Sequence, residues 1–184
     1  MDYRPIIAYL AMLVLYRLSE MAAMVWVGSW RRRPKWEWTV PLVVGSFLLI
    51  LIAPVLECLY RGTRPSLMAY ASGGFFFLLA ILFRTRGHLD LRRGFSMAVE
   101  RVDGQPLVDT GLYRHIRHPL YLGTLCLFVA CPMFLAARLS WVLTFLGFLA
   151  VYVRIRKEER FLAEQMTGYK DYMTRTWALI PKVY

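Results

Sequence analysis

The sequence predicts an all-helical integral membrane protein with five transmembrane helices in a single domain, residues 1–184. Composition is the first reason: 58% of the 184 residues are hydrophobic and 19% are charged, whereas soluble domains are about half apolar and about a quarter charged. The second reason is the presence of five apolar runs near the roughly 20 residues that a helix needs to cross a bilayer. No alternation typical of a β-barrel interrupts these runs, so helices are the expected spanning elements.

The first half of the chain supplies three of the predicted spans, at about residues 5–27, 39–60 and 66–83. The first span contains Arg17 and Glu20, which lie three residues apart and are expected to neutralise one another. The second contains Glu57, which lies near the outer interface and is expected to extend towards it. The third contains Gly73-Gly74, a pair of small residues that favours close packing of helices.

The second half supplies two further spans, at about residues 119–137 and 139–156. The short link between them, Ala136 to Ser140, predicts an antiparallel helical hairpin. The stretch 84–118 is too long for a simple connection. In the tail, residues 157–184, apolar residues recur at helical spacing and predict one apolar helix face; they are Leu162, Met166, Tyr169, Met173 and Trp177. The long stretch, the hairpin and the tail are expected to form a cytoplasmic pocket.

The distribution of basic residues predicts the orientation. The chain has 23 Lys and Arg residues; most follow spans one, three and five, and few follow spans two and four. Cytoplasmic loops carry the excess of basic residues, so the N-terminus is expected outside and the C-terminus in the cytoplasm. The membrane would be the inner membrane of a prokaryote or the endoplasmic reticulum of a eukaryote. Topology accounts for most of the charge, so membrane lipids are the expected partners and nucleic acid is not.

Metal binding is not expected. His115 and His118 have a spacing that fits one helix face, but neither a cysteine nor a third histidine follows at ligand spacing. The three cysteines, Cys58, Cys126 and Cys131, all lie in apolar runs. They are interpreted as inert buried thiols.

The densest chemical signal is the segment Gly111–Gly123, which leads into the fourth span. Pro119 suits the first position of a helix, whose first turn presents N–H groups and a partial positive charge. Together with Arg114, Arg117 and His118, this turn suits a carboxylate or a phosphate. An interpretation of equal weight makes these side chains ordinary anchors for lipid headgroups.

A second signal lies at the cytoplasmic end of the fifth span, where Arg154 and Glu158 share a helix face. One interpretation is an exposed ion pair of little energetic value. The other is a pocket in which Glu158 faces a cation and Arg154 faces an anion. The hairpin should bring Tyr121, at the start of the fourth span, close to both side chains.

These motifs resemble those of the isoprenylcysteine carboxyl methyltransferase family, which is related to the phospholipid N-methyltransferases. The similarity covers about residues 84–184. The similar signature comprises Gly111-x-Tyr113, Arg117-His118-Pro119-x-Tyr121-x-Gly123, Arg154-x-x-x-Glu158-Glu159, Tyr169, Tyr172 and Pro181, preceded by a Leu-Val step at Gln105-Pro106-Leu107-Val108.

The resemblance implies that S-adenosyl-L-methionine binds in the cytoplasmic pocket. It places Arg154 at the substrate and, with Glu158, in the catalytic role. The methionyl carboxylate suits His118 and the start of the fourth span, and the positive sulfonium and amino group suit Glu158 and aromatic rings. The implied cofactor contacts are Gln105, Pro106, Leu107, Val108, Tyr113, His118, Pro119, Leu120, Tyr121 and Glu158.

The resemblance also implies a lipophilic methyl acceptor that enters from the bilayer, with the carboxylate of an isoprenylcysteine-like or other lipid as the leading candidate. A phospholipid or amine N-methyltransferase and a thiol S-methyltransferase remain alternatives, because the residues do not specify which atom is methylated. The alternative outside enzymes is a small helical membrane subunit that binds anionic lipid.

Overall fold

The computed structural model describes residues 2–28, 38–91 and 107–182. Over these residues the chain forms six α-helices and one 3-10 helix, and its only β-pairing is an isolated bridge. The predicted all-helical fold class is confirmed. The elements are α1 (Arg4–Trp26), α2 (Thr39–Arg61), α3 (Leu67–Leu91), η2 (Gly111–Arg114), α4 (Pro119–Phe134), α5 (Ser140–Gln165) and α6 (Tyr169–Arg175).

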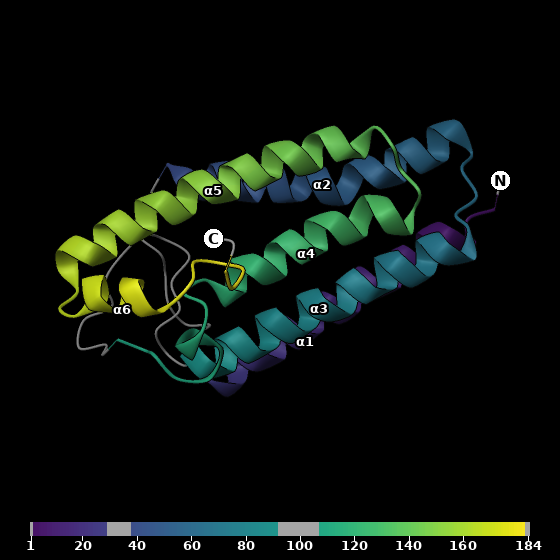
Figure 1. Ribbon diagram of the computed structural model, residues 1–184. Helices are drawn as coiled ribbons and strands as arrows, with labels where there is room; N and C mark the ends of the chain where they lie inside the picture. Colours follow the sequence, from purple (N-terminus) through teal and green to yellow (C-terminus); the bar gives the residue numbers. More distant parts are fainter. Residues whose placement is uncertain (1, 29–37, 92–106, 183–184) are drawn as a thin grey trace.

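Helix α4 is the central element of an elongated bundle (Figure 1). It packs mainly against α3, which also contacts α1, while α5 packs mainly against α2. Eleven of the 16 residues of α4 are buried, and none of its large hydrophobic side chains is exposed. Consecutive helices α4 and α5 are antiparallel, as predicted, but each has its main packing partner elsewhere in the bundle.

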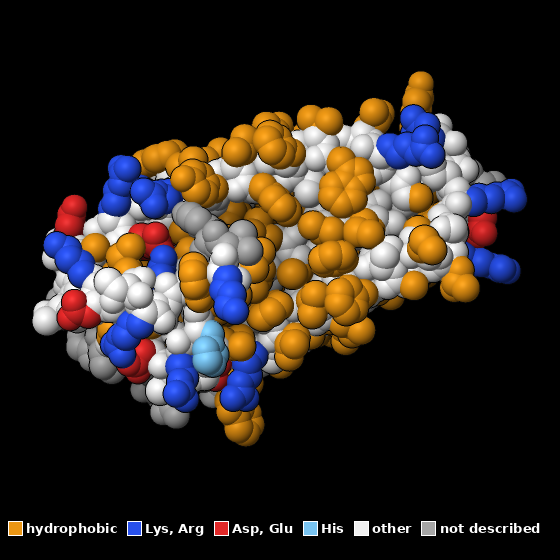
Figure 2. All heavy atoms as spheres, in the orientation of Figure 1, with side chains coloured by type: hydrophobic (Ala, Val, Ile, Leu, Met, Phe, Trp, Pro, Cys, Tyr) orange, Lys and Arg blue, Asp and Glu red, His pale blue; other side chains and the backbone are white. Residues whose placement is uncertain are grey.

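The outer helices expose apolar side chains along their lengths. Figure 2 shows a belt of hydrophobic side chains over the middle of the molecule, with charged side chains at its two ends. Among the described residues, α1, α2 and α3 are long and apolar enough to cross a membrane. Helix α4 is apolar but shorter, at 16 residues. The apolar belt and the three long helices are typical of an integral membrane protein.

Two helices run further than the sequence predicted. Helix α3 continues to Leu91 rather than ending near residue 83, so the first part of the predicted long connection is helical. Helix α5 continues to Gln165 rather than ending near residue 156. The predictions ended each span where charged residues begin. Arg, Lys and Glu are good helix formers, however, so charge ends the apolar run without ending the helix.

The tail does not form one continuous amphipathic helix, and this prediction was wrong. Gly168 adopts a left-handed conformation with φ 81° and separates α5 from α6. Of the five residues of the predicted apolar face, Tyr169 is buried whereas Trp177 is 44% exposed. The turn at Gly168 rotates the chain, so that Tyr169 and Tyr172 face inward together.

Glu20 joins α1 to α3 through ion pairs. The residue is 2% exposed, and its carboxylate lies 2.5 Å from the guanidinium of Arg17, which confirms the expected pairing. A second cation, Arg84 of α3, contacts the same carboxylate. Arg84 also donates to the hydroxyl of Thr124 in α4 at 3.1 Å. The charge of Glu20 is therefore compensated inside the bundle, where an unpaired carboxylate would be costly.

Glu57 caps a helix, a role that the sequence did not predict. Its side chain accepts hydrogen bonds from the backbone N–H groups of Arg138, Leu139 and Ser140 at 2.7 to 3.0 Å. The hydroxyl of Ser140 donates to the same carboxylate at 2.9 Å. A negative charge is favourable at the N-terminus of a helix. Glu57 of α2 thus provides hydrogen-bond acceptors for the N–H groups at the start of α5 and holds these two helices together.

Candidate functional site

The start of α4 and the last turns of α5 meet through three side chains that the sequence singled out. The hydroxyl of Tyr121 donates to Oε2 of Glu158 at 2.7 Å. The same hydroxyl accepts a hydrogen bond from Nε of Arg154 at 2.8 Å. The expected approach of the two helix ends is thus observed. Tyr121 bridges the two charged groups, which the sequence had placed on a common face without assigning anything between them.

Arg154 is a buried cation whose guanidinium is fastened at two nitrogens. The residue is 4% exposed, so its charge depends on hydrogen-bond partners within the protein. Besides its contact with Tyr121, its Nη1 donates to Oγ1 of Thr39 at 2.6 Å. Thr39 is fully buried at the start of α2. This contact was not predicted, because Thr39 lies far from Arg154 in the sequence and belongs to no recognisable motif.

Glu159 organises a second part of the site, although the sequence had assigned it no role beyond the signature. Its Oε1 accepts a hydrogen bond from Nε of Arg117 at 2.7 Å and lies 3.3 Å from Nε2 of His118. Burial by itself would raise the pKa of Glu159, but the contacts with His118 and Arg117 outweigh it and hold the pKa below its ordinary value. Glu159 therefore remains an anion between two cation-forming side chains.

Arg114 and Arg117 do not take the places that the predicted anion site gave them. The guanidinium of Arg117 is engaged by Glu159 and by the backbone carbonyls of Met173 and Thr176. His118 is 4% exposed, and its ring lies 5.6 Å from that of Tyr121. Arg114 is exposed. Arg117 thus serves internal structure rather than an external phosphate or lipid headgroup.

The C-terminal segment 176–178 lies against the segment that enters α4. The N–H of Arg117 donates to Trp177 O at 2.8 Å, and the N–H of His118 donates to Ala178 O at 3.0 Å. The N–H of Trp177 in turn donates to His115 O at 3.0 Å. These bonds form the isolated parallel bridge between Ile116 and Trp177. The tail therefore lies against the residues that lead into α4, through an extended segment after α6.

Tyr113 and Gly111 are positioned by the part of α3 that the sequence had not predicted. Asp90 accepts a hydrogen bond from the N–H of Leu112 at 2.9 Å. Gly111 has φ +60°, and a Cβ atom there would lie 2.3 Å from the Asp90 carboxylate. The positive φ therefore favours glycine at this position, and any larger residue would also have to displace the Asp90 side chain. The hydroxyl of Tyr172 donates to Tyr113 O at 2.6 Å, which connects α6 to the same turn.

The remaining predicted site residues lie around this region. Tyr113, Pro119 and Leu120 are buried, whereas Leu107 and Val108 are half-buried. Gln105 and Pro106 lie outside the described residues. Among the described residues, no group of three or more His, Cys, Asp or Glu is arranged to hold a metal ion. His115 is exposed while His118 is buried, so the two rings do not share a surface.

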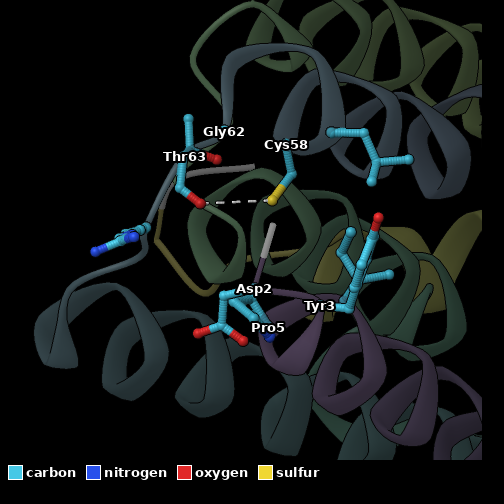
Figure 3. Close-up of a pocket in the computed structure, with 9 residues that line it drawn as sticks. Asp2, Tyr3, Pro5, Cys58, Gly62 and Thr63 are labelled. Carbon is cyan, nitrogen blue, oxygen red and sulfur yellow. Dashed lines mark hydrogen bonds between the residues drawn. The ribbon is translucent and has the colours of Figure 1, made fainter.

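A small cavity of about 80 Å³ lies at the opposite end of the bundle, between the start of α1 and the α2–α3 connection (Figure 3). Its lining includes Asp2, Tyr3 and Thr63, together with Cys58, whose thiol contacts Thr63 O at 3.7 Å. None of the residues that the sequence assigned to cofactor or substrate lines it. The candidate site is therefore the junction of α4 and α5 and not this cavity.

The lowered pKa of Glu159 predicts that the C-terminal segment loosens at acid pH. The contribution of Glu159 to stability is fully present above its ordinary pKa of 4.5 and is lost as the pH falls through its lower pKa in the folded protein.

At neutral pH, Arg117→Met should leave the Glu159 carboxylate buried without its closest cation. This should reduce the protection of the Trp177 amide by about two orders of magnitude, or about 3 kcal/mol. Hydrogen exchange followed by mass spectrometry measures both effects.

The matched control for that exchange experiment is Arg114→Met, in the same turn but with an exposed side chain. It should leave the protection of the Trp177 amide unchanged. Equal protection in Arg117→Met and wild type would show that the ion pair does not hold the segment.

The fold and the site together define a class: a helical membrane protein with a polar site at one end of an apolar bundle. Residues 73–164, half of the chain, match the Isoprenylcysteine carboxyl methyltransferase (ICMT) family. The chain belongs to this family. The match contains α4 and most of α5, and with them the residues Tyr121, Arg154 and Glu158.

Two curated relatives have similar sequences. The chain is 32% identical over 101 residues to methanethiol S-methyltransferase 2 of Bradyrhizobium diazoefficiens, a match that covers 53% of this chain and 39% of that protein. It is 32% identical over 83 residues to methanethiol S-methyltransferase of Mycobacterium tuberculosis, covering 42% of this chain and 34% of that protein. The matched part thus amounts to well under half the length of either relative.

The fold also resembles that of a solved structure. The eukaryotic intramembrane Ras methyltransferase ICMT superposes with a TM-score of 0.72, and the alignment covers 98% of this chain and 67% of that chain. The sequence identity is 19%. This likeness concerns the fold alone, and it includes helices α1 and α2, which precede the family match.

Proposed function

We propose that this protein is a membrane methyltransferase that binds S-adenosyl-L-methionine at the junction of α4 and α5. It would transfer the methyl group to an apolar acceptor that carries an anionic nucleophile. The observation that supports this best is the bridge formed by Tyr121 between Glu158 and Arg154. It places an anion and a buried cation side by side in the part of the chain that matches the family.

The chemistry of the residues at this junction fits the cofactor. When bound, it supplies a methyl group on a positively charged sulfur. The half-buried carboxylate of Glu158 suits the positive charges of its sulfonium and amino groups. The rings of Tyr113 and Tyr121 supply faces that attract cations. His118, buried against Glu159, would act at the methionyl carboxylate, near the N-terminus of α4.

Arg154 favours an acceptor that reacts as an anion. A carboxylate brings its own lone pair at neutral pH, so no side chain has to remove a proton from it. A thiol must first lose its proton to water, and the positive charge of Arg154 favours the resulting thiolate. The protein then needs to align the acceptor with the methyl group and to exclude water. A buried guanidinium suits such an acceptor and would repel a protonated amine. This makes phospholipid N-methylation the less favoured alternative.

The leading acceptor is the carboxylate of an isoprenylcysteine-like lipid, as the name of the family suggests. A small thiol is the second candidate, because both curated relatives are named methanethiol S-methyltransferases. Both acceptors can present an apolar group and a negative charge. The apolar belt in Figure 2 supports entry of either one from the bilayer.

The proposed topology follows the positive-inside rule. Five helices, α1 to α5, would cross the membrane, with the N-terminus outside and the C-terminus in the cytoplasm. The candidate site would then face the cytoplasm, where a soluble cofactor has access to it.

Binding of the demethylated product, S-adenosylhomocysteine, tests the cofactor site. Titration of the purified protein in detergent, followed by calorimetry, should show saturable binding. His118→Ala and Glu158→Ala should each weaken this binding about tenfold, the effect expected for loss of one hydrogen bond or ionic contact in a shielded site. Absence of saturable binding by the wild type would contradict the proposal.

Matched controls for these substitutions are available in the same elements. His115→Ala removes an exposed histidine three residues before His118, and Glu164→Ala removes an exposed glutamate of α5. Both should bind S-adenosylhomocysteine like the wild type. If the controls lose as much affinity as His118→Ala and Glu158→Ala, the cofactor lies elsewhere.

The chemical form of the product identifies the acceptor. Protein in vesicles would be incubated with methyl-labelled cofactor and either S-farnesylcysteine or methanethiol. Base-labile label indicates an ester, whereas base-stable volatile label indicates a thioether. Label that accumulates instead in an amine headgroup of the vesicle lipids would favour the phospholipid alternative.

A further inference from the structure

Thr39 brings α2 into contact with the proposed acceptor site. It is the first residue of α2, is fully buried, and accepts a hydrogen bond from Nη1 of Arg154 at 2.6 Å. The family match begins at residue 73, so this contact comes from a part of the chain outside it. We propose that Thr39 is a positioning residue that sets the direction of the Arg154 guanidinium and thereby the affinity for the methyl acceptor. The inference rests on the proposed function.

The geometry of a guanidinium makes two contacts sufficient for this role. Its N–H groups lie in one plane in a rigid fork, so fixing two of them fixes where the others point. Tyr121 accepts from Nε of Arg154 and Thr39 accepts from Nη1. One contact comes from α4 and the other from α2. Loss of the Thr39 contact would remove the tie from α2 and leave the tie from Tyr121 of α4 in place.

A second interaction holds the start of α2 against α5. Nζ of Lys157 lies 5.0 Å from the ring centroid of Trp38, the residue before Thr39. Lys157 and Arg154 are three residues apart on α5, so both reach the same end of α2. Thr39 is therefore held in place by more than its own hydroxyl, and a change in that hydroxyl should not displace the helix.

The two helices also face the bilayer side by side. Leu42 and Leu49 of α2 and Val153 of α5 are all exposed apolar side chains, as expected of lipid-facing helices. An acceptor that reaches Arg154 from the bilayer would pass the end of this helix pair. The contact between Thr39 and Arg154 therefore lies at the end of the helix pair that such an acceptor would pass.

Thr39→Val and Thr39→Ser test the inference. Valine keeps the shape of threonine without the hydroxyl, whereas serine keeps the hydroxyl. We expect Thr39→Val to raise the acceptor KM about tenfold or more, the effect of losing one hydrogen bond to a charged group. The Kd for S-adenosylhomocysteine should stay within about twofold of wild type, and Thr39→Ser should restore the acceptor KM to near wild type. The acceptor probes are S-farnesylcysteine and methanethiol, measured as above.

Thr144→Val is the matched control. Thr144 is also buried, on α5, and its hydroxyl donates to Phe128 O at 3.2 Å, within the helix packing. This variant loses a buried threonine hydroxyl as well, but its acceptor KM should equal that of the wild type. The comparison separates a general effect of burying valine from an effect on Arg154.

The outcomes distinguish the two proposals. An unchanged acceptor KM in Thr39→Val would overturn the inference while leaving the proposed function in place. Parallel loss of S-adenosylhomocysteine binding in that variant would also overturn it, because Thr39 would then support the site as a whole. If the wild type binds S-adenosylhomocysteine but methylates neither probe, the proposed acceptor class fails and the inference fails with it.

Discussion

Replacement of Gly73 by alanine is expected to destabilise the protein by about 3 kcal/mol, at the upper end of the usual cost of overpacking. A Cβ atom at Gly73 would lie 2.6 Å from both the Cα and the backbone N of Phe134. Backbone atoms cannot move aside as the end of a flexible side chain can. Helices α3 and α4 would therefore have to separate along the most extensive helix contact among the described residues.

Gly74→Ala is the control for that experiment. No atom lies within 4 Å of a Cβ built at Gly74, although the residue is adjacent and belongs to the same helix. This variant should unfold at the same temperature as wild type or slightly above it, because alanine favours helix over glycine. Thermal unfolding in detergent, followed by circular dichroism, measures both variants. Equal destabilisation by the two substitutions would show that close packing at Gly73 is not the cause.

Replacement of Tyr121 by phenylalanine is expected to lower kcat/KM for methyl transfer about a hundredfold. Two hydrogen bonds to charged groups depend on this hydroxyl, and each such bond contributes about 1.5–3 kcal/mol. Without the bridge, Glu158 and Arg154 are four residues apart on one helix face and can pair directly. Each would then neutralise the charge that the other should offer to a ligand.

The readouts for Tyr121→Phe are kcat/KM with the acceptor probes and the Kd for S-adenosylhomocysteine, which should rise as well. Tyr60→Phe is the matched control, because Tyr60 of α2 is 91% exposed and loses only a solvated hydroxyl. Wild-type kinetics in Tyr121→Phe would show that the bridge has no role in the reaction.

The fold class and the order of the helices were predictable because they depend on composition and on the length of apolar runs. The ends of α3 and α5 were not, because Arg84 and Arg156 end a hydrophobic pattern without opposing helix formation. The consequence matters for the site. The extension of α3 carries Asp90, which positions the turn at Gly111, and the extension of α5 carries Glu158 beyond the apolar run.

The site was predictable where its residues form a pattern along the chain. Tyr121 follows a proline at a helix start, and Arg154 and Glu158 share a face by their spacing, so their approach could be expected from a helical hairpin. Glu57 and Arg117 show the limit of such inference. Each was interpreted as facing outward. The partner of Glu57 is the start of α5, and the partner of Arg117 is the segment 173–176. Both partners are distant in the sequence, so no local pattern indicated them.

The amino-acid sequence alone determines that this protein is a bundle of apolar helices, because helix periodicity and lipid solubility are local properties of the chain. Only the tertiary structure decides which partner each buried charge finds. Glu57 caps α5, Arg117 pairs with Glu159, and Arg154 reaches Thr39 on the neighbouring helix α2. A buried charge must be satisfied by whichever polar group the packing brings within about 3 Å, and packing is set by contacts between helices rather than by spacing along one of them.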